Sequence, residues 1–527
     1  MPAAVPPAPL VLDGQPVLLD DVYEVAVAHR AVEVGSGARA RMEAARAQLD
    51  RLVDERRLVY GVTTGYGPMA ATHVGPARSA ELQRNLVAML SSSVGPPLST
   101  AHTRALMAAR AVALSQGHSA LRPEALDVLL ACLRHDVLPI IPRRGTVGAS
   151  GDLAPLAHMT WALMGEGDVL WKGERRPAAE ALAAIGVAPL SLAEKEGLAF
   201  VNGTSVMAGI AAVTGVRAER ALRVALGLAV LYAELLRGRA EAFHDGIARL
   251  RPHPGQLAVT ARLAALAAGS RRLVPHGPPP RLDDAEAVLT DQELPQDPYT
   301  IRCAPQLFGA VHDVLAFHRR TVETELTAVT DNPLFVPDDD LVLHGGNFYG
   351  QHVAFAADAL GMAVLKMAAH AERVLARVTD PALNGGLPAF LQPREPGLRS
   401  GFMGAQITAT AVLAEMRTQA VPASVQSIPT NANNQDVVTM GTIAARRAAE
   451  QVDHLYDLLA IEALVLAQGL ELEGGLDADG GFAPASVALA AWVRERAAFL
   501  ADDRPLAPDL ARLAADLRDG PLPDALR

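Results

Sequence analysis

The sequence predicts a mainly α-helical protein built around long helices. Half of its 527 residues are apolar and only 20% are charged, which indicates a large buried fraction. Segments rich in alanine and leucine repeat with helical spacing, and little of the chain alternates with a period of two. Three irregular segments interrupt the helices, and loops this long in a helical protein are usually functional or disordered. They lie at residues 60–75, 277–299 and 383–401.

The expected elements follow in chain order. Short β-hairpins are expected at residues 10–20, where Asp13-Gly14 suits a two-residue turn, and at 169–174. A helix is expected at 122–134, because proline is tolerated in a first helical turn. Long helices are expected at 205–237, 304–328, 351–378, 402–420 and 436–470.

The length of the chain and its apolar pattern indicate how it divides into regions. A chain of 527 residues exceeds a usual single core, so subdomains are expected. We place an N-terminal region at residues 1–204 and a helical region at 205–527. Within the latter, residues 224–233 are apolar all round, which indicates a helix enclosed by other helices.

The composition also limits the partners. A net charge of −11 disfavours a nucleic-acid or anionic-membrane surface. The first residues lack a basic segment followed by a continuous apolar run, so no export signal is expected, and the apolar run at 224–233 is too short to span a bilayer. Cys132 and Cys303 have neither metal-ligand spacing nor a disulfide framework. We expect a soluble, cytoplasmic protein without a membrane partner or a metal.

Residues 145–159, GTVGASGDLAPLAHM, place Ser150 among small residues. A hydrolase nucleophile elbow needs glycines two before and two after the serine; Gly148 fits, but residue 152 is aspartate. His158 lies two helical turns away if the segment is a helix, too far to act as the base for Ser150. A Walker phosphate loop is excluded because no Gly-Lys-Ser/Thr follows.

The same stretch has the features of a helix start. Asp152 is a good N-cap and Pro155 is tolerable in the first turn. Ala149, Ser150 and Gly151 then lie at the positive end of a helix with little side chain around them. The backbone can turn tightly enough there for a nitrogen to attack a carbonyl two residues away. From these residues alone, a plain capped helix after a glycine loop is the favoured interpretation.

Other segments of the sequence favour the attack of a backbone nitrogen on a carbonyl over a plain capped helix. The stretch resembles the signature of the histidine, phenylalanine and tyrosine ammonia-lyases and related aminomutases, and five further segments match this family in the same order. They are Tyr60-Gly-Val-Thr-Thr-Gly-Tyr-Gly67, Asn202-Gly-Thr-Ser205, Gln296-Asp-Pro-Tyr-Thr-Ile-Arg-Cys303, Asn347-Phe348 after two glycines, and Thr430-Asn-Ala-Asn-Asn-Gln-Asp-Val-Val438. The resemblance covers residues 10–520.

The resemblance implies a long-helix bundle of the ammonia-lyase/fumarase-like superfamily, with a mixed N-terminal region and small β-hairpins. It implies that Ala149, Ser150 and Gly151 form the electrophilic cofactor 4-methylideneimidazole-5-one (MIO) autocatalytically. Tyr60 would be the catalytic base, on a mobile lid with hinges at its glycines. Arg302 would bind the substrate carboxylate as a bidentate fork. Catalytic Tyr299 and the substrate-binding residues complete the implied site, the latter being Gly67, Met89, Leu90, Asn202, Gln296, Phe348, Asn431 and Gln435. Considered one at a time, each of these residues could instead have a purely structural role, in core packing or in an ion pair.

The implied activity is ammonia elimination from phenylalanine or tyrosine, by a homotetramer with shared active sites. A 2,3-aminomutase is the alternative, and a non-catalytic helical scaffold is a remote one. Histidine lyases of the family carry Ser-His at Met89-Leu90 and glutamate at Gln435, so histidine is disfavoured as a substrate. Tyrosine-selective members place histidine at Met89, whose thioether accepts hydrogen bonds only weakly. We therefore expect phenylalanine to be preferred, although the sequence as a whole looks closer to bacterial tyrosine lyases.

Overall fold

The computed structural model describes residues 8–277, 296–476 and 480–527. The chain divides into two compact units, each made of three separate stretches. Unit 1 comprises residues 1–216, 317–359 and 422–449, and unit 2 comprises 217–316, 360–421 and 450–527. The sequence-based boundary at residue 204 precedes a long helix, whereas the division between the units falls inside four long helices. The central part of the irregular segment expected at 277–299 lies outside the described residues.

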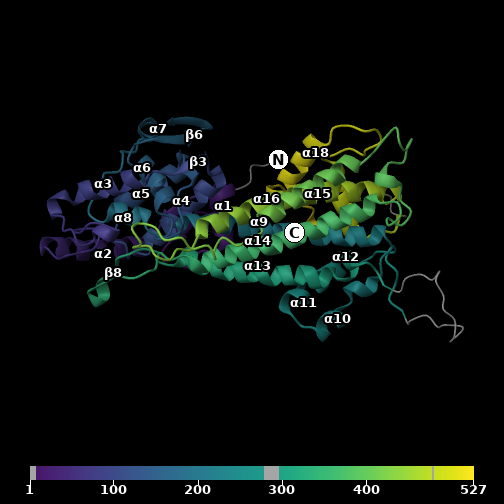
Figure 1. The fold of residues 1–527 in the computed structure, drawn as a ribbon, viewed down its shortest axis with the longest axis horizontal. Coiled ribbons are helices and arrows are strands. Elements are labelled where there is room, and N and C mark those ends of the chain that lie inside the picture. Colours follow the sequence, from purple (N-terminus) through teal and green to yellow (C-terminus); the bar gives the residue numbers. More distant parts are fainter. Residues whose placement is uncertain (1–7, 278–295, 477–479) are drawn as a thin grey trace. The chain divides into compact units, whose positions relative to one another are not determined.

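Unit 1 holds the shorter helices of the N-terminal half, drawn in purple and blue in Figure 1. Helix α4 is its centre: every residue from Thr103 to Ser115 is buried, and the helix packs against α1, α5 and α8. These helices are α1 (Leu19–Val27), α2 (Ser36–Asp54), α3 (Ser79–Leu90), α4 (Thr100–Ser115), α5 (Pro123–Arg134), α6 (Leu153–Leu163), α7 (Ala178–Ala184) and α8 (Glu196–Val201). The helix predicted at 122–134 is confirmed as α5, with Pro123 in its first turn.

The described strands are short and all belong to unit 1. They are β1 (Leu10–Leu12), β2 (Val32–Val34), β3 (Val94–Pro97), β4 (Leu138–Pro139), β5 (Pro142–Arg144), β6 (Asp168–Trp171), β7 (Glu174–Pro177), β8 (Leu334–Val336) and β9 (Leu341–Leu343). The hairpin expected at 169–174 is confirmed as β6 and β7, which pair antiparallel. Lys172 and Gly173 form its turn with φ of 52° and 78°, as a type I′ turn requires.

The hairpin expected at residues 10–20 is wrong. Strand β1 pairs in parallel with β2, and helix α1 lies between them in the chain. Asp13 has another role: its carboxylate accepts a hydrogen bond from the backbone nitrogen of Ala38 at 2.6 Å. Ala38 lies in the first turn of α2, whose N-cap is Gly35 and has no side chain to cap it. Asp13 therefore supplies the cap from 25 residues away, an option that the local turn signal does not reveal.

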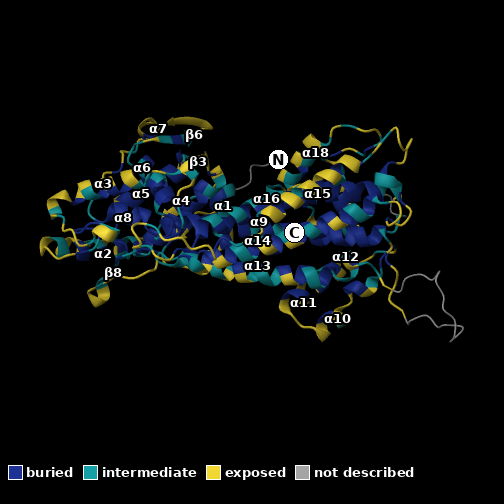
Figure 2. Cartoon of the chain, viewed as in Figure 1, coloured by how far each residue is buried: buried dark blue, intermediate teal, exposed yellow. Residues whose placement is uncertain are grey.

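The long helices follow the predicted segments closely. They are α9 (Ser205–Leu235), α13 (Ala304–Thr327), α14 (Gln351–Thr379), α15 (Met403–Thr418) and α16 (Gly441–Leu472). The apolar run at 224–233 is buried on all sides, as expected. Figure 2 shows buried residues in dark blue and exposed ones in yellow. The described part of unit 2 also contains α10 (Asp245–Leu250), α11 (Pro254–Leu266), α12 (Tyr299–Arg302), α17 (Pro484–Arg494) and α18 (Ala507–Asp519).

Short 3₁₀ turns lie mainly in the loops. They are η1 (Gly67–Met69), η2 (Pro76–Arg78), η3 (Ala240–Phe243), η4 (Pro337–Asp339), η5 (Ala389–Leu391) and η7 (Asp524–Leu526). Among the described helices, α14 alone is long and apolar enough to cross a membrane by length and composition. Half of its most apolar window is buried inside the protein, and enclosed core helices pass the same test, so this is weak evidence for a membrane span.

Candidate active site

The backbone around Ser150 forms a tight turn that only small residues allow. Gly148 and Gly151 have φ of 74° and 69°, in the region that favours glycine. A Cβ atom on Gly151 would lie 2.1 Å from the carbonyl oxygen of Gly203. That same oxygen accepts a hydrogen bond from the backbone nitrogen of Asp152 at 2.7 Å. The turn is therefore fixed against the loop that precedes α9.

Asp152 stands at the N-cap position of α6, but its side chain does not cap that helix. Its carboxylate accepts hydrogen bonds from the backbone nitrogens of Val206 and Met207, at 2.9 and 2.8 Å, and one from the Thr442 hydroxyl. The predicted capping role is thus wrong for α6, because the side chain satisfies the first turn of α9 instead. Complete burial raises the pKa of Asp152 to about 6, although these three donors oppose the rise.

Two amide side chains reach Ser150 from distant parts of unit 1. Asn202 donates from Nδ2 to the Ser150 carbonyl oxygen, and Gln435 donates from Nε2 to its hydroxyl, both at 3.3 Å. The Gln435 side chain is fixed in turn, since Thr430 donates to its Oε1 at 2.7 Å. The Oδ1 of Asn202 is buried without a hydrogen-bond partner. Buried polar atoms are rarely left without a partner, so this oxygen is an exception beside the Ser150 turn.

A cavity of about 500 Å³ opens onto this turn. Ten of the residues proposed from the sequence line it together, and they come from five of the six matched segments and from α3. They are Tyr60, Gly67, Met89, Leu90, Ala149, Ser150, Asn202, Phe348, Asn431 and Gln435. Segments far apart in the chain therefore meet around one serine, as the resemblance implies.

Sequence reasoning missed the other lining residues, which are Tyr66, Leu86, Leu153, Leu198, Asn332, Tyr349, Asn434, Asp436 and Val437. Five of them lie inside the matched segments, so reading every position of those segments finds them: Tyr66, Leu153, Asn434, Asp436 and Val437. Asn332 and Leu198 carry no such signal. Only the packed chain brings them to the cavity.

Tyr60 lies at the start of the irregular loop at 60–75. Its phenolic oxygen accepts a hydrogen bond from the backbone nitrogen of Gly67 at 2.9 Å. The Tyr66 ring meets it edge to face, with the ring centres 6.4 Å apart. Burial raises the pKa of Tyr66 above its usual range, and the neighbouring Tyr60 adds to the rise. Tyr66 therefore stays a neutral phenol beside Tyr60. The first part of the loop is anchored, because Thr63 and Thr64 are buried; its action as a mobile lid stays a prediction.

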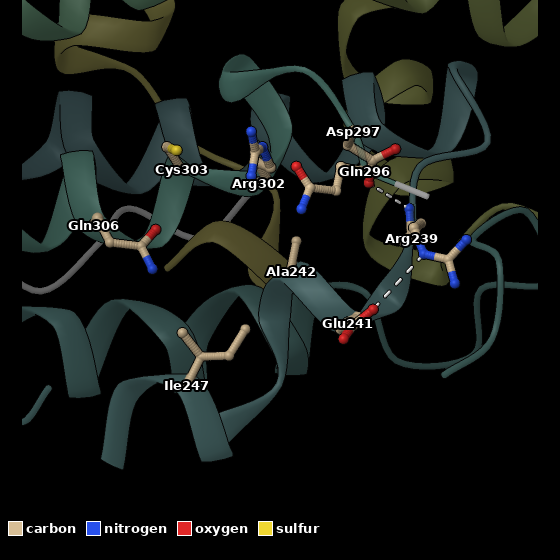
Figure 3. A pocket seen from close by; sticks show the side chains of 9 residues that line it. All are labelled: Arg239, Glu241, Ala242, Ile247, Gln296, Asp297, Arg302, Cys303 and Gln306. Carbon is tan, nitrogen blue, oxygen red and sulfur yellow. Dashed lines mark hydrogen bonds and ion pairs between the residues drawn. The ribbon is translucent and has the colours of Figure 1, made fainter. Parts of the chain in front are cut away.

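The residues that line the Ser150 cavity do not include Arg302, Gln296 or Tyr299. All three belong to unit 2, where Arg302 and Gln296 line a second cavity, of about 380 Å³. In Figure 3, both side chains lie on the same side of that cavity as Asp297, which accepts a hydrogen bond from the backbone nitrogen of Arg239 at 2.7 Å. Tyr299 is 71% exposed, with the Arg302 guanidinium 4.5 Å from its ring centre. The Nε of Arg302 is buried without a hydrogen-bond partner.

The histidine and the two cysteines considered from the sequence lie as follows. The Nε2 of His158 accepts from the backbone nitrogen of Ser93 at 3.1 Å, so this ring atom is engaged away from Ser150. Across residues 8–277, 296–476 and 480–527, no three side chains of histidine, cysteine, aspartate or glutamate gather to hold a metal ion. Cys132 and Cys303 are both free thiols.

Comparison with known proteins agrees with this geometry. The model of the aromatic amino acid lyase family matches residues 17–495. A tyrosine ammonia-lyase of Cereibacter sphaeroides is 47% identical, over 98% of this chain and 99% of its own. A histidine ammonia-lyase of Symbiobacterium thermophilum is 42% identical, over 97% and 96%. The crystal structure of a tyrosine aminomutase from Streptomyces globisporus superposes with a TM-score of 0.92 at 38% identity, covering 97% of both chains.

The helical fold and these relatives define the class: the protein is a carbon–nitrogen lyase. The family match spans nearly the whole chain, and the relatives match over nearly their full lengths. The chain belongs to the aromatic amino acid lyase family.

Proposed function

We propose that this protein eliminates ammonia from phenylalanine, tyrosine or both, and releases trans-cinnamate or p-coumarate. The observation that carries the proposal is the shared cavity, in which the Ala149-Ser150-Gly151 turn lies with Tyr60 and Asn202. The elimination needs a better leaving group on the α-carbon and a base for the β-proton. In the cavity, the Ala149-Ser150-Gly151 turn would serve the first requirement and Tyr60 the second.

The residues of the turn fit the cofactor MIO, formed from Ala149, Ser150 and Gly151. In that conversion the Gly151 nitrogen bonds to the Ala149 carbonyl carbon with loss of one water, and Ser150 loses its hydroxyl as a second water. The fit rests on the crowding at Gly151, which leaves no room for a side chain, and on the unpaired Oδ1 of Asn202. The group supplies an electrophilic carbon that takes up the substrate amine. Asn202 would hold it through the bond that now reaches the Ser150 carbonyl.

Tyr60 is proposed as the base. A phenol has an ordinary pKa of about 10, so its anion must be stabilised for work near neutrality. The Gly67 nitrogen donates a hydrogen bond to the phenolic oxygen, and this bond holds the Tyr60 side chain at the cavity. The Tyr66 ring packs edge to face against the Tyr60 ring. Tyr60 is therefore held in the same cavity as Ser150, where a base for the β-proton is needed.

We propose further that the protein is a homotetramer in which different copies share each active site. Arg302 and Gln296 line a cavity of unit 2, whereas Ser150 and Tyr60 line the cavity of unit 1. A second copy that brings Arg302 to the Ser150 cavity would supply the carboxylate fork, with Tyr299 beside it. Exposed apolar side chains support such an interface: Met403 and Ile407 lie one turn apart on α15.

Within the aromatic amino acids, we propose that phenylalanine is preferred. Met89 lines the cavity and offers a phenol hydroxyl only a thioether. The Oε1 of Gln435 accepts a hydrogen bond from Thr430, so this oxygen is already engaged. The tyrosine ammonia-lyase relative argues for the opposite preference. The ratio of kcat/KM for phenylalanine and tyrosine decides between them.

A 2,3-aminomutase is the second candidate, because a tyrosine aminomutase has the same fold over 97% of its chain. It would re-add ammonia at the β-carbon. We also propose a cytoplasmic location without a nucleic-acid or membrane partner, in keeping with the net charge of −11.

One assay tests the proposed activity. Purified protein is incubated with phenylalanine, tyrosine and histidine; ammonia is measured enzymatically, arylacrylate by its absorbance, and β-amino acid by chiral chromatography. Ammonia and arylacrylate in equal amounts support the lyase. Accumulation of the β-amino acid supports the aminomutase, and no product from any of the three substrates contradicts both.

A further inference from the structure

Gln83 is a buried polar residue for which the proposed chemistry has no role. It lies on α3 and its side chain is fully buried. Its amide joins the backbones of two different segments. Nε2 donates to the carbonyl oxygen of Gly61 at 2.8 Å, and Oε1 accepts from the backbone nitrogen of Leu198 at 3.0 Å. One planar amide thus fixes the separation of two backbone groups.

The first bond holds the loop of the proposed base. Gly61 follows Tyr60 directly and has φ of 67°. A Cβ on Gly61 would lie 2.6 Å from a methyl carbon of Leu198, so the loop is pressed against α8. Ser79, at the start of α3, adds a hydrogen bond from its hydroxyl to the carbonyl oxygen of Val62 at 3.1 Å. Two consecutive carbonyls after Tyr60 are therefore held by α3.

The second bond holds the helix that leads to Asn202. The N-cap of α8 is Lys195, which makes no capping hydrogen bond with its side chain. Gln83 satisfies the Leu198 nitrogen in the first turn of this helix instead. The helix ends at Val201, and the next residue, Asn202, donates to the Ser150 carbonyl. A Cβ on Gly197 would lie 2.8 Å from the Gln83 carbonyl oxygen, so the two helices approach closely.

We infer that Gln83 is a positioning residue that fixes the Tyr60 loop and α8 in one frame, so that the base keeps its distance from a substrate held at the Ser150 turn. The inference rests on the proposed function, because it takes Tyr60 as the base. Proton abstraction depends steeply on this distance: a displacement of about 1 Å can cost roughly a hundredfold in rate. Gln83 touches no reacting atom and acts through the Tyr60 loop and α8.

The experiment replaces Gln83 by methionine, which keeps the volume and removes both hydrogen bonds. The Gly61 carbonyl and the Leu198 nitrogen are then buried without partners. We expect kcat to fall by about tenfold or more, while KM stays close to that of the wild type. With substrate deuterated at the β-carbon, the primary isotope effect on kcat should increase, because a misplaced base makes proton abstraction slower relative to the other steps.

Gln468→Met is the matched control. Gln468 on α16 is also fully buried, and its amide donates to the carbonyl and accepts from the nitrogen of Leu500, both at 3.0 Å. Its loss should lower thermal stability as the Gln83 variant does, with the isotope effect of the wild type retained. Equal kcat and equal isotope effects in the two variants would overturn the inference.

Gln83→Asn serves if Gln83→Met does not fold. Its amide is shorter by one methylene and cannot span both backbone groups, so the same rise in the isotope effect is expected. A wild-type isotope effect and kcat in this variant would also overturn the inference. Failure of the proposed function is a different result: neither the wild type nor Gln468→Met would then release ammonia.

Discussion

The cavity around Ser150 and the cavity around Arg302 are built by different means. At Ser150 the precision lies in the backbone, where two glycines with positive φ and the Gly203 carbonyl fix the turn. At Arg302 the lining is mostly long, charged or amide side chains, with Arg239, Glu241 and Gln306 around it. The Arg302 guanidinium has a buried nitrogen without a partner.

This difference matches the two tasks that we propose. Making a covalent electrophile requires backbone atoms in one fixed conformation, which tight packing provides. Binding a carboxylate requires a fork of donors that closes on a ligand, which a flexible side chain with unused donors provides. Changes at the first cavity should therefore abolish the reaction, and changes at the second should weaken binding.

The largest effect is expected at Ser150. Ser150→Ala removes the hydroxyl whose loss creates the electrophile, while the small side chain fits the same turn. The variant should fold and lose at least about three orders of magnitude in kcat/KM. Ammonia release and the circular-dichroism melting curve, measured side by side, check this. Activity within tenfold of the wild type would show that Ser150 is not converted.

A smaller loss is expected from Tyr60→Phe. The ring and its packing against Tyr66 remain, but the oxygen that accepts from Gly67 is gone. Turnover should fall by about 10²–10⁴, the usual contribution of a general base. Substrate affinity, measured by equilibrium dialysis in a variant that still forms the electrophile, should stay within a few-fold of the wild type. If turnover is unchanged, another residue is the base.

Arg302 tests the expectation that changes at the second cavity weaken substrate binding. Arg302→Lys keeps the charge and loses the bidentate fork, so KM should rise by roughly tenfold while kcat changes less. Arg302→Ala should raise KM further. Inhibition by the carboxylate product should weaken in parallel. A fall in kcat without a change in KM, in both variants, would contradict a carboxylate-binding role.

Met89 should control selectivity. Met89→His offers a partner to a phenol hydroxyl, and an unpaired buried hydroxyl costs about 1–3 kcal/mol. The ratio of kcat/KM for tyrosine over phenylalanine should therefore rise by about one order of magnitude. Competition assays with both substrates in one mixture give this ratio directly. A wild type that already prefers tyrosine would refute the argument from Met89 and direct attention to Asn431 or Asn434.

The smallest effect is on stability and compares two buried carboxyl groups. Asp152 in unit 1 has three donors, and its pKa rises only to about 6. Glu462 in unit 2 is shifted by burial alone, and its pKa rises to about 8. The folded state binds this proton more tightly than the unfolded state, so the stability that Glu462 contributes is full below its ordinary pKa of about 4.5 and is lost as the pH rises towards 8.

Glu462→Gln removes this dependence. The melting temperature of the variant relative to the wild type should therefore increase steadily between pH 4.5 and pH 8, the pKa limits of this group. Scanning calorimetry across this range measures the difference. A constant difference would show that Glu462 keeps its ordinary pKa in the folded protein.

The long helices could be predicted because their apolar pattern is continuous: the segment expected at 304–328 is α13, Ala304–Thr327. The pattern predicts that α16 starts at residue 436, whereas the helix starts at Gly441. The pattern does not show that Thr439 donates to the Gly148 carbonyl or that Met440 has φ of 56°. The contacts of Thr439 and the backbone conformation of Met440 therefore prevent the helix from starting where its periodicity predicts.

The site was predictable where it follows local motifs and less so where it depends on distant contacts. Tyr60, Ser150 and Gln435 meet in one cavity, as expected from their segments. The roles of Asp13 and Asp152 were not predictable from local capping signals. Asp13 caps α2, which is distant from it in the sequence, and Asp152 caps α9 instead of α6, the helix that directly follows it. Capping signals identify the residue type but not the partner helix.

The most direct test of the account is the mass of the protein itself. Intact-protein mass spectrometry of active wild type, followed by digestion to the peptide that contains residues 145–159, compares the measured mass with that of the unmodified sequence. Conversion of Ala149, Ser150 and Gly151 predicts a mass lower by two water molecules, located in this peptide and absent from Ser150→Ala. An unmodified mass in protein that releases ammonia would contradict the central claim.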